Sequence, residues 1–98
     1  MVENELIQIL NKQIDTDFAE EISMQALQEK LTLLINDLIL NNFQRLVAIL
    51  YKVDVDENKL KRILKENSGN DAAGIIAHLI IEREVQKMET RKQFRNTK

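Results

Sequence analysis

The chain lacks cysteine, proline and tryptophan, and its 98 residues include only two glycines, Gly69 and Gly74. Without cysteine there is no disulfide framework, no thiolate zinc site and no cysteine nucleophile, which fits a reducing compartment. Proline and glycine supply most tight turns, so their scarcity disfavours folds built from many short strands. We therefore expect an all-α protein.

Long apolar runs are also missing. The longest apolar stretches, residues 31–40 and 72–81, are interrupted by polar residues. Both fall far below the roughly 20 residues that span a bilayer. The first residues lack the basic region and the long apolar region of a signal peptide. We expect a cytoplasmic protein with no membrane partner, forming a single helical domain over residues 1–98.

Charge is unevenly distributed along the chain. Residues 1–40 carry eight acids and two bases, a net −6, whereas residues 41–98 carry eight acids and twelve bases, a net +4, which together give the overall −2. Such polarity either attracts an acidic partner to the C-terminal half or lets the two halves attract each other.

Apolar residues recur at helical spacing and predict a bundle of four to five helices. After a first helix over about residues 3–13, we expect a second to begin at Asp17, because Asp17 and Glu20 have the spacing of a capping box. It runs to about residue 40. The pair Asn41-Asn42 is a weak boundary, where the helix either kinks or continues into a segment ending near Lys52.

Acidic residues mark the start of a fourth helix. Asp56 is a plausible N-cap, with Val55 and Leu60 placed as a hydrophobic staple, and Asp54 with Glu57 offers a competing capping box. Residues 67–69 should end this helix, with Gly69 at the left-handed stop. A fifth helix then starts at Asn70 or Asp71.

Residues 72–81 are apolar on nearly every side, which predicts that this part of the fifth helix is central to the bundle. It should pack against stripes from residues 18–39 and 43–51, with Ile76 and Leu46 in the core. Beyond it the sequence turns polar. Residues 83–98 are expected to form a charged helical extension that projects or frays.

Several chemistries fail on inspection. Asp54 to Asn58 match the first positions of an EF-hand loop, but Lys59 and Lys65 stand where glycine and a bidentate glutamate are required. His78 and Glu82 lie one helical turn apart without a third group to support catalysis or metal binding. Tyr51 is expected at the edge of the core. We predict no catalytic residue, no metal site and no cofactor, and hence a protein that is not an enzyme.

A cationic ladder occupies the C-terminal part of the chain. Arg83, Lys87, Arg91 and Arg95 recur every four residues. On a helix they form a slowly drifting stripe that could contact nucleic acid or an acidic partner. Interspersed glutamates favour ordinary solvated salt bridges instead. A basic cluster on the fourth helix, Lys59 to Lys65, would add to the stripe if both share a face.

Excess apolar surface gives the leading functional hypothesis. Residues 31–39 and 72–81 offer more apolar faces than so small a bundle easily encloses, and bundles often resolve such an excess by dimerising. We expect a non-enzymatic protein–protein interaction module that forms a homo-oligomer, with a dimer favoured. Another protein partner, or nucleic acid bound by the basic C-terminal helix, is the alternative.

Two stretches carry a family resemblance: residues 37–57, DLILNNFQRLVAILYKVDVDE, and residues 75–83, IIAHLIIER. They resemble an uncharacterised family of small helical cytoplasmic proteins found in Bacteroidota. The resemblance implies a compact helical protein with no assigned activity, and it transfers no catalytic or ligand residues.

Overall fold

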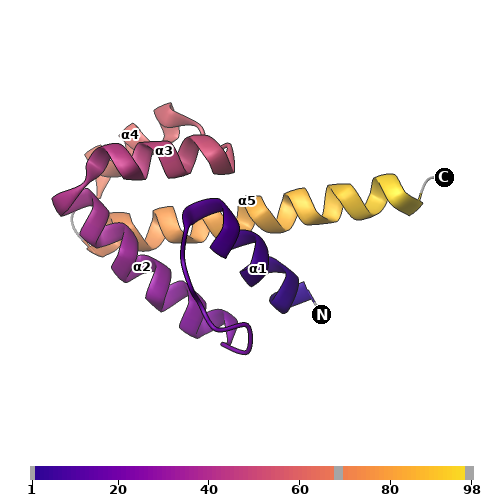
Figure 1. Ribbon diagram of the computed structural model, residues 1–98. Helices are drawn as coiled ribbons and strands as arrows, with labels where there is room; N and C mark the ends of the chain where they lie inside the picture. Colours follow the sequence, from indigo (N-terminus) through magenta and orange to yellow (C-terminus); the bar gives the residue numbers. More distant parts are fainter. Residues whose placement is uncertain (1, 68–69, 97–98) are drawn as a thin grey trace.

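The computed structural model describes residues 2–67 and 70–96, and within these ranges the chain forms five α-helices and no strand. This confirms the predicted all-α bundle (Figure 1). The helices are α1 (Val2–Ile14), α2 (Met24–Asn41), α3 (Phe43–Val53), α4 (Glu57–Glu66) and α5 (Asn70–Asn96). None of the helices in the described part of the chain is long and apolar enough to cross a membrane.

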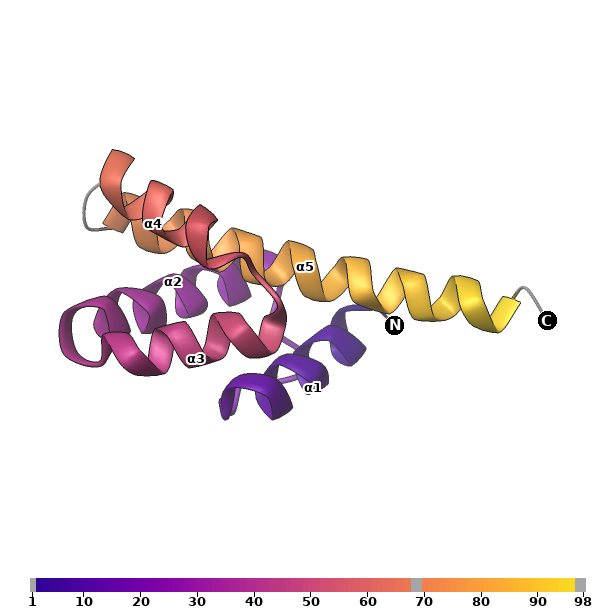
Figure 2. The ribbon, with the colours of Figure 1, turned by 90° about the horizontal axis from the view of Figure 1, so that it is seen from above.

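Helix α5 is the central element of the fold, as predicted. It packs against all four other helices and most extensively against α2. Figures 1 and 2 show α5 running the whole length of the molecule, with its last turns extending past the other helices. The extension begins later than residue 83, because Glu84 and Met88 are still buried and Lys92 lies 3.9 Å from Glu5 of α1.

One hydrophobic core joins all five helices. The predicted core residues Leu46 and Ile76 are 0% and 1% exposed. Helix α1 adds four side chains that are almost completely buried: Leu6, Ile7, Leu10 and Ile14. Removing a large apolar side chain from water stabilises a fold by roughly 1.5–3 kcal/mol, so these four residues alone anchor α1 firmly.

Asn42 separates α2 from α3, which settles the boundary that the sequence left open. Its backbone N–H donates the last helical bond of α2, to Leu38 O at 2.9 Å. Its side-chain Oδ1 accepts from Arg45 N at 3.3 Å and so begins α3. With φ at −156° the residue is non-helical, and a single asparagine therefore caps two successive helices.

The link between α3 and α4 confirms one predicted cap and corrects another. Asp56 is the N-cap of α4 and accepts a hydrogen bond from Asn58 N at 3.1 Å. The competing box with Asp54 and Glu57 is wrong, because Asp54 ends α3 in the left-handed conformation at φ 71°. Aspartate tolerates that conformation better than most residues. The stop predicted at Gly69 lies outside the described residues.

The predicted start of the second helix at Asp17 is wrong. Helix α2 begins at Met24, and its N-cap is Ser23, whose side chain accepts from Ala26 N at 3.1 Å. The reason lies in α1, where the Asn11 side chain accepts from Phe18 N at 2.9 Å and donates to Phe18 O at 3.0 Å. The Phe18 carbonyl is therefore taken by Asn11 and does not accept from the amide four residues on, as a helix would need.

Candidate interaction surface

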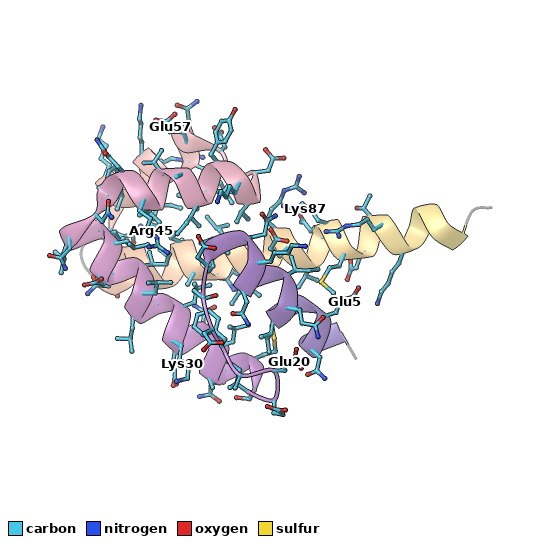
Figure 3. The ribbon with its side chains drawn as sticks, viewed as in Figure 1. Glu5, Glu20, Lys30, Arg45, Glu57 and Lys87 are labelled. Atoms are coloured by element: carbon cyan, nitrogen blue, oxygen red, sulfur yellow. The ribbon has the colours of Figure 1, made fainter. Side chains whose placement is uncertain are left out.

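The outer face of α2 carries two strongly exposed leucines. Leu33 and Leu40 are 70% and 73% exposed and lie seven residues apart, so they share one face of the helix. Ala26 continues this stripe by another seven residues, and Lys30 and Asp37 flank it on one side. Lys30 points away from the other helices in Figure 3. We call Ala26, Lys30, Leu33, Asp37 and Leu40 the α2 outer face.

The opposite side of α2 explains why these leucines are left out. Four apolar residues of α2 at spacings of three and four are buried against the core: Leu27, Leu31, Ile35 and Leu38. A helix presents one stripe to a core, so Leu33 and Leu40, outside that stripe, face solvent. Within the described chain the excess apolar surface predicted for residues 72–81 is mostly enclosed, although Ile75 is 38% exposed.

A second apolar surface is a groove of about 460 Å³ between α3 and α4. Its apolar wall comes from Val47, Leu50, Val55 and Leu60, and Tyr51 stands at the rim. Tyr51 is 87% exposed, so the prediction that it lies at the edge of the core is wrong. Tyr51 follows Leu50 on α3 by about 100° of rotation, which carries it from the buried side of the helix to the solvent.

Acidic side chains of the same chain engage half of the cationic ladder. Arg83 Nη2 lies 3.0 Å from Asp54 Oδ2, and Lys87 Nζ lies 2.9 Å from Glu84 Oε1. Arg91 is exposed, and the side chain of Arg95 lies outside the described residues. The structure therefore uses Arg83 and Lys87 within the fold, which lowers the positive charge that the ladder offers to a partner.

Acidic side chains lie between the basic cluster on α4 and the cationic ladder on α5. Lys59 and Arg83 line one shallow hollow together with Asp54, Asp56 and Glu82. The other basic residues of α4, Lys61, Arg62 and Lys65, are exposed, and Lys61 lies 3.9 Å from Glu57. Opposite charges alternate across this region, so it does not form a continuous positive face.

The His78 and Glu82 pair forms as the sequence spacing allows. His78 Nε2 lies 3.2 Å from Glu82 Oε2, and both side chains are more than half exposed. An exposed pair in water gains little from its ionic interaction and lacks the dry pocket that strengthens catalytic groups. Among residues 2–67 and 70–96, no group of three histidine, aspartate or glutamate side chains could hold a metal ion.

Sequence analysis missed one buried acid. Glu84 is 0% exposed, and neither carboxylate oxygen accepts a hydrogen bond from the described residues. Lys87 Nζ is close to Oε1 but without hydrogen-bond geometry. The available signal was position, because Glu84 lies four residues after the buried Ile80 and four before the buried Met88. The burial of Glu84 depends on tertiary packing. Because charged residues surround it in the sequence, the pattern predicted a solvent-exposed position instead.

Comparison of the chain with protein-family models, with curated proteins and with solved structures gives no match.

Proposed function

We propose that this protein is a non-enzymatic protein–protein interaction module that associates with a second copy of itself through the α2 outer face. The observation that carries the proposal is the exposure of Leu33 and Leu40, 70% and 73%, on a helix whose other side is fully packed. Exposed apolar side chains aligned on one face are typical of interaction surfaces. The proposal places the module in the cytoplasm, where the absence of cysteine fits a reducing environment.

The α2 outer face is complementary to itself, which favours a second copy over another partner. If two α2 helices pair antiparallel around Leu33, the two Leu33 side chains meet at the twofold axis. Leu40 of each copy then lies opposite Ala26 of the other. Lys30 and Asp37 flank the stripe on the same side, so each Lys30 comes beside the second copy's Asp37. Two ion pairs and a continuous apolar seam result.

Energetic magnitudes indicate that this face alone gives weak association. Two leucines from each copy, each about 70% exposed, contribute about 4–8 kcal/mol when buried. Association costs about 4–15 kcal/mol in lost translational and rotational freedom. The balance runs from slightly favourable to clearly unfavourable. A stable dimer therefore needs further buried surface besides the α2 outer face.

Sedimentation equilibrium tests the proposal. Changing Leu33 and Leu40 to Ser should weaken self-association by at least about tenfold, since a loss of 1.4 kcal/mol already gives that factor. Tyr51→Ser is the control, because it removes a large side chain that is even more exposed, 87%, from the rim of the α3–α4 groove. The control should leave the dissociation constant unchanged. If Tyr51→Ser weakens association and the leucine changes do not, the α2 outer face is the wrong surface.

Binding of nucleic acid by Arg83, Lys87, Arg91 and Arg95 is the second candidate and has less support. Arg83 and Lys87 already lie within 3.0 Å of Asp54 and Glu84. Retention on a heparin column distinguishes the candidates. If the basic helix binds phosphate, changing all four residues to Gln should shift elution to clearly lower salt.

A further inference from the structure

The connector between α1 and α2, residues 15–23, can form a helix but does not do so here. It contains no glycine and no proline, and Asp17 and Glu20 have the spacing of a capping box. Ala19, Glu20 and Glu21 are good helix formers. In the structure the segment is irregular and keeps a single turn, in which Ile22 N donates to Ala19 O at 3.2 Å. Tertiary contacts therefore oppose the local preference.

Helix α1 supplies those contacts. Besides its two bonds to Phe18, Asn11 Oδ1 accepts from the Thr16 hydroxyl at 2.8 Å. Gln8 Nε2 donates to Glu20 Oε1 at 2.8 Å. Across residues 15–22, the hydrogen bonds of the connector run to α1 or within the connector itself. The irregular form therefore depends on where α1 lies.

A helical connector would lengthen the α2 outer face. With about 100° of rotation per residue, Ile22 and Phe18 fall within about 60° of Leu33 in a continuous helix. The stripe would then read Phe18, Ile22, Ala26, Leu33 and Leu40. In the antiparallel pairing around Leu33, Ile22 reaches the end of the second copy's α2, where Phe43 begins α3 and is 43% exposed here. The exposed leucines thus become the end of a longer apolar seam.

The same change would carry α1 away from its own binding site. In both Figures 1 and 2, α1 and α2 run in the same general direction, so the connector returns past α1 to reach the start of α2. A helix over residues 17–23 moves residue 17 about 10 Å beyond that start. Only residues 15 and 16 would then span a gap that nine residues now span, and they are too short to keep α1 in place.

We infer that α1 exchanges between two copies of this protein, with the connector turning helical as the hinge. Leu6, Ile7, Leu10 and Ile14 are at most 2% exposed against α5, α3 and the rest of the core, so a displaced α1 needs an equivalent cover. A second copy offers the identical surface. The contacts of α1 are the same on either copy, so the net gain over the monomer comes from the new seam that the helical connector adds at Phe18 and Ile22. This inference rests on the proposed self-association.

Cross-linking between singly labelled copies tests the exchange. The chain has no native cysteine, so a single cysteine introduced into each of two chains reports the contact between those two positions alone. Glu5 and Lys92 are about half exposed, and Glu5 Oε2 lies 3.9 Å from Lys92 Nζ. Full-length E5C and K92C chains of different tagged mass are unfolded together, refolded and treated with a short bismaleimide. A mixture of E5C with K61C is the matched control, because Lys61 is an exposed lysine on α4.

Two hinge variants act in opposite directions. Ala19 and Glu21 are exposed, so changing both to Gly weakens only the helical connector and should lower the cross-link between copies by about tenfold or more. Asn11→Ala removes the bonds that hold the irregular connector and should raise the cross-link severalfold. A glycine variant that cross-links as well as the parent would overturn the helical hinge.

Light scattering on the same refolded samples separates the two proposals. The expected result is a dimeric mass with far more cross-link between E5C and K92C chains than between E5C and K61C chains. A dimeric mass with equal cross-linking in both mixtures would overturn the exchange and leave self-association intact. A monomeric mass at every concentration would overturn both.

Discussion

The two ends of α2 are joined to the chain in different ways. At the C-terminal end, Asn42 alone ends α2 and begins α3, using backbone groups no more than four residues away. At the N-terminal end, Ser23 caps α2, but the preceding connector is held by Asn11 of α1. The first joint is fixed by local chemistry, whereas the second depends on a neighbouring helix. Only the second can change when packing changes.

The largest expected loss of stability comes from substitutions in the hydrophobic core, against which α2 packs between its two connections. Ile76 on α5 and Leu46 on α3 are fully buried, so Ile76→Asp or Leu46→Asp would bury an unpaired charge. We expect a loss of more than about 4 kcal/mol and no cooperative thermal transition by circular dichroism. A variant melting cooperatively near the parent temperature would remove that residue from the core.

A smaller loss in the free energy of unfolding is expected when the ion pair of the buried Glu84 is broken. Lys87→Met leaves the buried Glu84 carboxylate without its cation and should cost about 3–5 kcal/mol in urea unfolding. The double change of Glu84 and Lys87 to Leu removes both charges and should be neutral or stabilising. If Lys87→Met alone has no effect, the carboxylate does not depend on Lys87.

Asn11→Asp should sharpen the contrast between the two joints. The carboxylate keeps an acceptor for Phe18 N but loses the amide that donates to Phe18 O. We expect a loss of about 1–3 kcal/mol, because Phe18 O would lose its partner in a partly buried site. Hydrogen exchange at Phe18 N should be faster than in the parent, because loss of the bond to Phe18 O lets the connector open more often even though this amide keeps its acceptor. Unchanged stability and exchange would contradict the role given to Asn11.

The smallest effect is expected from the same substitution at Asn42. Within the Asn42 side chain only the oxygen makes a hydrogen bond, as the acceptor for Arg45 N, and aspartate keeps that oxygen. Asn42→Asp should therefore change the free energy of unfolding by less than about 0.5 kcal/mol. Asn42→Ala, which removes the acceptor, should cost about 1 kcal/mol. Thermal unfolding of the two variants measures the difference. Equal losses would show that the Asn42 side chain is not what begins α3.

The features that could be predicted from the sequence are those set by residues a few positions apart along the chain. The cap at Asp56 and the burial of Leu46 and Ile76 follow from local patterns, and the all-α fold follows from helical periodicity. The spacing left open whether the helix breaks at Asn42, and the structure shows that it does. The capping-box spacing of Asp17 and Glu20 predicted a helix start at Asp17, but a contact across seven residues, from Asn11 to Phe18, overrides it.

The candidate site was predictable only in part. The apolar excess in residues 31–39 was visible, but which leucines remain outside depends on the direction from which α5 packs against α2. The basic ladder was also visible, and so was the three-residue spacing of Glu84 and Lys87, but not the burial of Glu84. The pairing of Arg83 with Asp54 joins residues that only the tertiary arrangement brings together, so it leaves no periodic trace.

The central claim is self-association through the α2 outer face, and the most direct test is the solution mass by light scattering over a range of concentrations, at low and at high salt. The account predicts a mass that rises from 11.4 kDa towards twice that value as concentration increases, at both salts, because the seam is mainly apolar. A mass that stays at 11.4 kDa up to millimolar concentration would contradict it.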